Sequence, residues 1–136
     1  MNELAKRKKK KGFTLVELIA VMAILAILAA VIAPKAMGYI KKAKQTKVVQ
    51  QCHTLVLAVD AYNADKPLSS QIKGDTALGT AGAEGNLKTL IDDELITETD
   101  VDKINSDVLI SECRDIANGT GTIDLDADDK LTKKKN

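Results

Sequence analysis

The chain has 136 residues, of which 45% are hydrophobic and 29% are charged, and its formal net charge is only +1. These averages describe an ordinary soluble domain, but they conceal sixteen consecutive apolar residues at positions 18–33 in an otherwise mostly polar sequence. One His and two Cys fall short of the three or four ligands of a zinc site, and one Phe, two Tyr and no Trp leave few side chains for stacking bases.

Charge is separated into blocks along the chain. Residues 1–12 carry six basic groups and one Glu, a net charge of +5. Residues 35–47, here called the lysine collar, carry five Lys and no acidic residue. Residues 60–129 carry seventeen carboxylates and five basic groups, a net charge of −12. An acidic surface of this kind repels phosphate, which disfavours binding of nucleic acid.

Residues 13–33 predict a transmembrane helix. As an α-helix these 21 residues span roughly 32 Å, close to the hydrocarbon thickness of a bilayer. The basic block before them favours a cytoplasmic N-terminus. Glu17 is the anomaly, because a carboxylate costs roughly 2.5 to 3.5 kcal/mol at the bilayer centre, and less near the interface. It indicates either a functional residue that needs a cationic partner or a boundary residue among the headgroups.

The run KKKKGFTLVELIAVMAILAILAAVIAP, residues 8–34, strongly resembles the N-terminal signature of type IV pilins and pseudopilins. The resemblance implies that a prepilin peptidase cuts between Gly12 and Phe13 and methylates the new amine of Phe13. The mature chain would then have 136 − 12 = 124 residues. It also implies that Glu17 pairs with the terminal amine of a neighbouring subunit during assembly. The alternative is an ordinary secretory signal with a cleavage site near residues 29–36.

The helix is expected to continue to Asp65, because Pro67 pushes the preceding residue out of the α region. Pro34 predicts a kink or a locally unwound stretch. Apolar residues then recur at helical spacing and predict one stripe that needs a cover. The stripe consists of Val48, Cys52, Leu55, Val59 and Tyr62.

Beyond the helix, four glycines at positions 74, 79, 82 and 85 mark a surface loop. We expect a short helix at Leu87–Leu95 capped by Asn86, and a helical turn at 101–105. The dipeptide Asn118-Gly119 predicts a β-hairpin between strands at 107–116 and 121–125.

The predicted fold is therefore α+β, with a long N-terminal helix packed on a small C-terminal head that contains a short antiparallel β-sheet. One half of the helix is transmembrane and the other half is amphipathic. The expected segments are a cytoplasmic basic leader at 1–12, a transmembrane and assembly helix at 13–33, an amphipathic helix at 34–65 and a small α+β head at 66–136.

Cys52 and Cys113 are candidates for a disulfide bond, because a head of this size commonly needs a staple and an external location favours oxidation. Two buried free thiols are the alternative. Asp124, Asp126 and Asp128 have the spacing of the first ligands of a calcium loop, but Asp129 stands where that loop needs Gly, so they are weak calcium candidates. No metal site and no cofactor is otherwise expected.

The leading interpretation is a structural subunit of a type IV pilus or pseudopilus, and not an enzyme, because one His and scattered carboxylates assemble no catalytic group. The resemblance implies a single-span precursor in the bacterial inner or plasma membrane, a pilus assembly platform as partner, and then a homo-oligomeric helical filament on the cell surface. In such a filament the lysine collar is expected to lie against acidic heads of other copies. The alternatives are a competence-type pseudopilin that assists DNA uptake, with nucleic acid as a partner, and a single-span anchored binding module.

Overall fold

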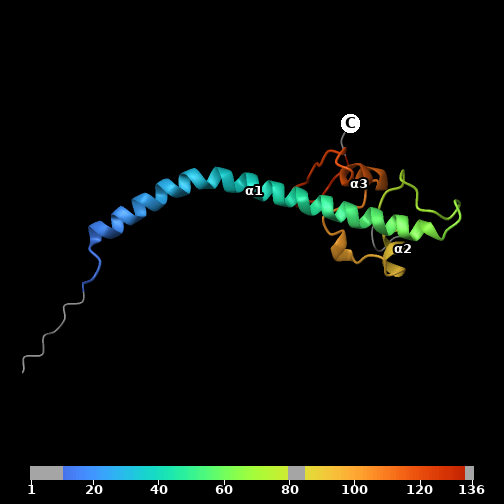
Figure 1. Ribbon diagram of the computed structural model, residues 1–136, viewed down its shortest axis with the longest axis horizontal. Coiled ribbons are helices and arrows are strands. Elements are labelled where there is room, and N and C mark those ends of the chain that lie inside the picture. The colour runs from blue at the N-terminus through green and yellow to red at the C-terminus, as the bar shows by residue number, and fades with distance from the viewer. Residues whose placement is uncertain (1–10, 80–84, 134–136) are drawn as a thin grey trace, which may run out of the picture. The chain divides into compact units, whose positions relative to one another are not determined.

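The structure is a computed structural model that describes residues 11–79 and 85–133. Its elements are α1 (Leu15–Ala64), α2 (Asn86–Asp92), the 3-10 helix η1 (Glu98–Asp100) and α3 (Ile110–Ala117) (Figure 1). Most of the predicted leader, Gly82 of the glycine-rich loop and the last three residues lie outside the described residues. The chain divides into two compact units, Met1–Tyr39 and Ile40–Asn136, and α1 contributes to both.

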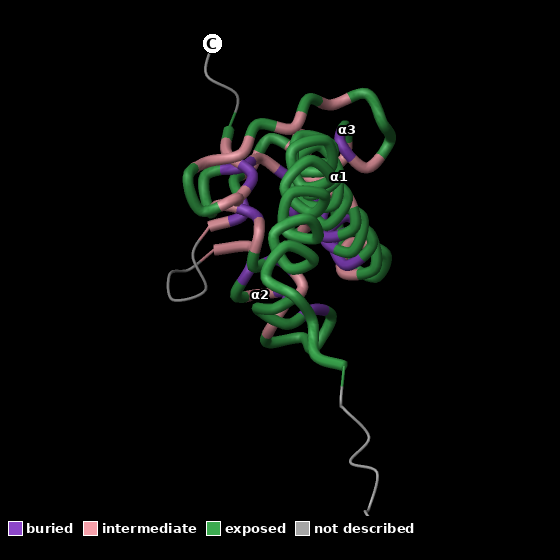
Figure 2. The backbone as a smooth tube through the Cα atoms, turned by 90° about the vertical axis from the view of Figure 1, so that its left-hand side faces the viewer, coloured by how far each residue is buried: buried purple, intermediate pink, exposed green. Residues whose placement is uncertain are grey.

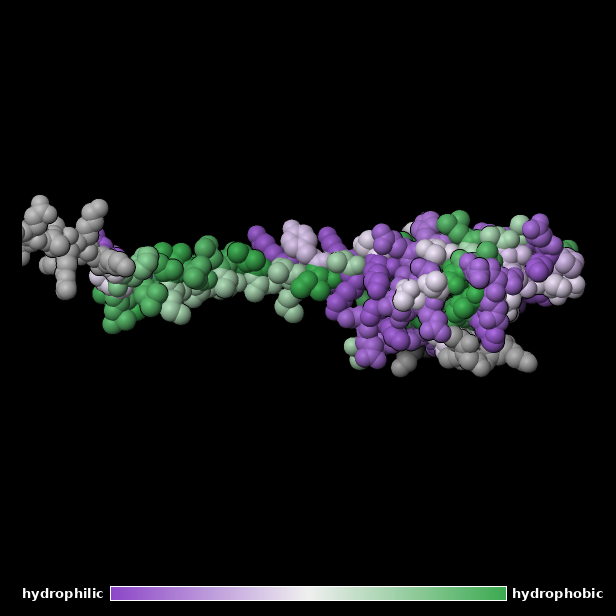
Figure 3. Space-filling view, turned by 90° about the horizontal axis from the view of Figure 1, so that it is seen from below, coloured by the Kyte–Doolittle hydropathy of each residue, from purple (hydrophilic) through white to green (hydrophobic). Residues whose placement is uncertain are grey.

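The first unit contains the apolar part of α1. Its described residues are exposed except for the half-buried Ala36, and hydrophobic side chains cover its surface (Figure 3). By length and composition this helix could cross a membrane. Of the kink or locally unwound stretch predicted at Pro34, the unwound stretch is absent: the residues on both sides of Pro34 are α-helical. The proline removes one N–H donor from the helix without ending it.

The second unit is built on the predicted stripe of α1, which is confirmed. Val48, Cys52, Leu55 and Val59 are buried, and the half-buried Tyr62 packs against the same core. Figure 2 shows buried backbone on this part of α1 and on the segments beside it. The other buried apolar residues belong to α1, α2 and α3, to the segments that connect them and to the segment after α3. They are Val56, Ala58, Ile72, Leu78, Leu87, Leu90, Ile96, Val101, Ile104, Val108, Ile110, Cys113, Ile116 and Leu131.

The predicted antiparallel sheet is wrong. The described residues contain no β-strand, and their only β-type pairings are three isolated bridges: Ala77 with Leu109, Ile104 with Leu131, and Leu125 with Leu131. The head is therefore a set of short helices and irregular segments packed on α1, and the α+β fold class becomes an all-helical one for the described part of the chain.

The predicted strand at 107–116 is largely the helix α3. Its buried residues, Ile110, Cys113 and Ile116, recur every third position, which is a helical spacing and not the alternation of a strand. The Glu112 carboxylate, in the first turn of α3, accepts a hydrogen bond from the Leu109 N–H at 2.9 Å. This bond satisfies a backbone donor at the start of the helix. The single β-bridge of Leu109 marks the only strand-like contact in this stretch.

The dipeptide Asn118-Gly119 ends α3 instead of turning a hairpin. Gly119 has φ +79°, its N–H donates to the Ile116 carbonyl at 3.1 Å, and the Thr120 N–H donates to the Asp115 carbonyl at 2.9 Å. These two bonds define a Schellman motif, in which glycine supplies the left-handed residue after the helix. Hairpin turns and helix ends both need a residue that tolerates positive φ, so the same dipeptide serves either structure.

Two smaller expectations also shift. The helix α2 ends at Asp92, three residues before the predicted end, and its N-cap is Gly85. Asn86 is the first residue of α2, and its side chain instead donates to the Thr76 hydroxyl at 3.0 Å. A hydrogen-bonded turn is present within 101–105, where the Ile104 N–H donates to the Val101 carbonyl at 3.0 Å. The 3-10 helix η1 precedes it, and Asp100 accepts the Thr97 N–H at 2.8 Å at its start.

A substitution at Gly119 tests this reading of the α3 terminus. Gly119→Ala should lower the free energy of unfolding of the head by about 1 kcal/mol, because alanine is strained at positive φ. Chemical denaturation of the detergent-solubilised protein, followed by circular dichroism, measures the change. The matched control is Gly38→Ala, at a helical position with open space around it, which should not destabilise. Equal unfolding of Gly119→Ala and the parent would contradict the Schellman assignment.

Candidate functional site

The start of α1 is organised by a reciprocal capping box. The Thr14 N–H donates to Glu17 Oε2 at 3.0 Å, and the Glu17 N–H donates to Thr14 Oγ1 at 3.2 Å. The motif is Thr-x-x-Glu immediately before an apolar run, which is a sequence signature of a helix N-terminus. The residues TLVE therefore predict a capping box at the start of the helix, in addition to their resemblance to the pilin signature. The Glu17 carboxylate is exposed, and a backbone N–H of its own chain satisfies one of its oxygens.

Phe13 precedes this box and is almost fully exposed, at 94% of its possible area. Gly12 before it has open space around its Cα. The two residues of the predicted cleavage site therefore lie outside the helix, which begins at Leu15. Neither end of the predicted scissile bond is protected by packing among the described residues. Glu17 follows Phe13 by four positions, inside the first turn of α1.

The lysine collar divides into two groups. Lys44 pairs with Asp129 at 2.6 Å and Lys47 pairs with Asp102 at 3.3 Å, both within the second unit. These two lysines therefore already have acidic partners in their own chain. Lys35, Lys41 and Lys42 are exposed and form no ion pair with any described residue. In the sequence the five lysines form one block. Which of them form an ion pair within the chain becomes clear only in the fold.

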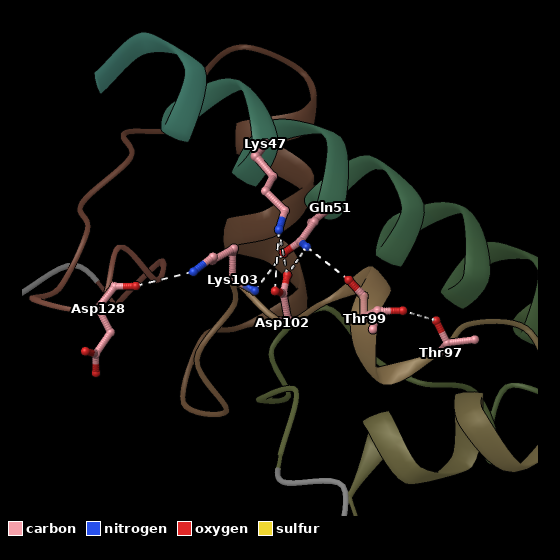
Figure 4. A network of polar contacts seen from close by, with 7 residues as sticks. All are labelled: Lys47, Gln51, Thr97, Thr99, Asp102, Lys103 and Asp128. Atoms are coloured by element: carbon pink, nitrogen blue, oxygen red, sulfur yellow. Dashed lines mark hydrogen bonds and ion pairs between the residues drawn. The ribbon is translucent and has the colours of Figure 1, made fainter. Parts of the chain in front are cut away.

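Gln51 connects α1 to the segment that follows η1 (Figure 4). It is 6% exposed, and its side chain accepts the Lys103 N–H at 2.8 Å and donates to the Thr99 carbonyl and to Asp102. A buried amide that satisfies its donors and its acceptor in this way fixes the register of two segments. The bond from Gln51 lowers the pKa of Asp102, and Lys47 lowers it further.

Arg114 of α3 forms a second connection to α1. Its guanidinium makes a bidentate pair with Asp60, at 2.7 and 3.2 Å. The bond to Asp60 raises the pKa of Arg114. Such a planar two-bond pair has a more defined geometry than a single lysine contact. Both partners are exposed by two fifths or more, so the pair orients α3 on α1 and contributes only modestly to stability.

The weak calcium candidates lie in a tight turn near the C-terminus. Asp126 Oδ1 accepts the N–H groups of Asp128 and Lys130, each at 2.9 Å, and Oδ2 accepts a bond from Asn105 at 2.8 Å. The bond from Asn105 lowers the pKa of Asp126, and the bond from the Lys130 backbone adds to this effect. The described residues contain no group of three or more His, Cys, Asp or Glu that could hold a metal. Asp126 therefore acts here as a structural acceptor of the turn.

Cys52 of α1 and Cys113 of α3 meet in the core. Both are fully buried and both are free thiols. A hydrogen bond with Cys52 raises the pKa of the Cys113 thiol, and burial raises it further. The two helices thus bring together the two cysteines predicted to pair, although both are free thiols and no disulfide joins them. A raised pKa keeps the thiol protonated and makes it a poor nucleophile.

Comparison with known proteins identifies the N-terminal segment. Residues 7–33 match the family described as the prokaryotic N-terminal methylation motif. A search of curated proteins found no match, and a search of solved structures found none. The chain therefore carries the N-terminal methylation motif, the class III signal of type IV pilins and pseudopilins. The match covers Gly12, Phe13, Glu17 and the apolar run, and it ends before the lysine collar.

The lowered pKa of Asp102 predicts how the head responds to acid. Because its folded pKa lies below the ordinary value of 3.8, its stabilising effect is present above that pH and is lost as the pH falls through the folded pKa. Asp102→Asn should therefore flatten the loss of stability below about pH 4. Urea denaturation at a series of pH values measures the slope. Asp93→Asn, at an exposed aspartate outside this network, should leave the slope unchanged. Equal slopes for both variants would refute the assignment.

Proposed function

We propose that this chain is a structural subunit of a type IV pilus or pseudopilus. The observation that carries the proposal is the methylation motif at 7–33 on a helix whose apolar surface is left uncovered by its own chain. Proteins with this motif are typically structural and not enzymatic. The subunit is held in the bacterial inner or plasma membrane by residues 13–33 until assembly, and then enters an extracellular filament of many copies.

Maturation is a hydrolysis followed by a methyl transfer. A prepilin peptidase cuts the amide bond between Gly12 and Phe13 and releases the leader 1–12. The new amine of Phe13 then accepts a methyl group and remains cationic. The residues on both sides of this bond are exposed and lie outside the helix, which supports the proposal because a peptidase needs an accessible backbone.

Glu17 then directs assembly. In the structure one oxygen of its carboxylate accepts the Thr14 N–H. In an apolar filament interior the carboxylate has no water around it, and a buried carboxylate without a countercharge is strongly unfavourable. Burial of the methylated ammonium of Phe13 on an incoming copy is equally unfavourable, because it is a cation without a countercharge. Each group neutralises the other, so assembly is favoured where the two meet.

The proposed assembly route involves the pilus assembly platform as a partner and no nucleic acid. The alternative of a competence-type pseudopilin that binds DNA is weakened by the ion pairs of the head. Lys44, Lys47 and Arg114 are each neutralised by an aspartate of the same chain and offer little to a phosphate backbone. If the leader is not cut, the alternative of a single-span anchored binding module is favoured.

Processing provides the first test. Intact mass and N-terminal sequencing of sheared surface material should reveal a chain that begins at N-methylated Phe13 and contains the remaining 124 residues, since 136 − 12 = 124. Gly12→Val should block the cut, because it places a bulky side chain at the scissile bond, and should leave only the precursor. Gly38→Ala is the matched control and should mature normally. A surface protein that begins at Met1, or after the apolar run, would overturn the proposed function.

Substitutions at the capping box separate the charge of Glu17 from its structural role. Glu17→Gln keeps the capping box, which glutamine also forms, but deletes the charge. It should fold and be cut normally and yet yield few or no filaments. Thr14→Val removes one capping bond, worth about 1 kcal/mol, and keeps the charge. It should still assemble.

Electron microscopy of sheared material, in a strain without the parental gene, counts the filaments of both variants. If Glu17→Gln assembles as well as the parent, the ion-pair mechanism is wrong. If Thr14→Val fails and Glu17→Gln succeeds, the cap and not the charge governs assembly.

We further propose that Cys52 and Cys113 become bonded outside the cell. Their neighbouring positions in the core and the oxidising external compartment support this proposal. The bond would close a loop of about 60 residues and stabilise the head by roughly 4 kcal/mol in the chain-entropy model. Non-reducing peptide mapping of freshly isolated filaments should recover the linked peptides. Alkylation of both thiols after unfolding without a reductant would show that they remain free.

A further inference from the structure

A pocket lies between α3 and the segment that follows it, coloured orange to red in Figure 1. Its volume is about 230 Å³. The Schellman motif turns the chain back at this point, and Gly121 packs directly on α3, where a Cβ would come within 2.6 Å of the Ile116 nitrogen. Only glycine permits this approach. The pocket is lined by three buried apolar residues, Val108, Ile116 and Leu131, here called its floor, and by more exposed polar residues, Glu112, Asp115 and Thr132, here called its rim.

Two carboxylates on the rim lack a countercharge. Glu112 is half-buried and uses one oxygen, Oε2, to accept the Leu109 N–H. Asp115 is exposed, and its backbone carbonyl, not its carboxylate, accepts the bonds from Thr120 and Gly121. Neither carboxylate forms an ion pair with any described residue. The neighbouring Arg114 is already engaged by Asp60.

The chemistry of this pocket fits a lysine side chain. An apolar floor below an acidic rim matches a side chain with an aliphatic stem and a cationic tip. The volume is below the roughly 300 to 1,000 Å³ of small-molecule sites, which favours a single inserted side chain over a ligand.

The lysine collar offers the matching groups. Lys35, Lys41 and Lys42 are exposed and unpaired in the part of the chain that the structure describes, whereas Lys44 and Lys47 are not available. With the Lys44–Asp129 and Lys47–Asp102 pairs set aside, the collar keeps 5 − 2 = +3 and residues 60–129 keep −12 + 2 = −10, charges of opposite sign that favour contact between these regions of two copies.

We propose that the pocket beside α3 receives a lysine of the collar, Lys35, Lys41 or Lys42, from a second copy of this chain. The proposal rests on the proposed function, because it needs a filament in which the collar of one copy meets the head of another. Apolar packing of the N-terminal helices provides the cohesion, and the lysine selects the register at which the copies stack.

Zero-length crosslinking tests the contact. Filaments built from a mixture of unlabelled and ¹⁵N-labelled full-length chains are treated with a carbodiimide, which joins a lysine amine to a carboxylate in direct contact. Mass spectrometry should recover a peptide of 35–42 joined to Glu112 or Asp115, with the two isotopes mixed between the halves. Asp115→Asn should reduce this product several-fold. Asp93→Asn, at an exposed acid remote from the pocket in sequence, should not.

A charge swap provides the second measurement. Lys41→Glu with Lys42→Glu should reduce filament yield in low salt more than in high salt, because exposed pairs are screened. Adding Asp115→Lys to that variant should restore yield, whereas adding Asp93→Lys should not. Intact filaments with no mixed-isotope crosslink at the pocket, or with equal rescue by both lysines, would overturn the pocket contact and leave the proposed function standing. Failure of the parental chain to form filaments would overturn both.

Discussion

The structure depends on one constraint, which is that a single helix carries two apolar surfaces and its own chain covers only one of them. In the second unit the stripe from Val48 to Val59 is buried by α2, α3 and the connecting segments. In the first unit the apolar residues around the helix are exposed on every side. Exposed apolar area of this extent is unfavourable in water at about 25 cal/mol per Å². A bilayer and then neighbouring copies can supply the missing cover.

In the proposed filament, charged groups determine the register at which neighbouring copies cover this apolar surface. The apolar run can pack at many registers, because methyl and methylene groups discriminate poorly between similar arrangements. The proposed ion pair between Glu17 and the Phe13 ammonium would disfavour arrangements that bury either charge alone. The capping box with Thr14 holds the Glu17 carboxylate at the start of the helix, beside the proposed site of the new amine. The lysine collar of α1 carries a second charge pattern through Lys35, Lys41 and Lys42, which form no ion pair with any described residue.

The sequence predicted the parts of the molecule that depend on long periodic patterns. The helix from Leu15 to Ala64 and the stripe on it follow from hydrophobic spacing over many turns. The head was predicted less well, because its signals are short and ambiguous. Asn118-Gly119 fits a hairpin and a Schellman motif equally, and the choice depends on whether the residues before it pack as a helix against α1. That packing is a tertiary effect, which outweighs local propensity.

The charged groups show the same limit. The sequence identified Glu17 and the collar as unusual, but the pairing of Lys44 and Lys47 with Asp129 and Asp102 depends on how distant segments approach in the fold.

The most direct measurement of the proposed ion pair between Glu17 and Phe13 is a structure of the assembled filament at side-chain resolution. The proposed ion-pair mechanism predicts that Glu17 of each copy lies within about 4 Å of the Phe13 nitrogen of a neighbouring copy. A filament in which Glu17 contacts only Thr14 of its own chain, with the Phe13 amine in solvent, would contradict it.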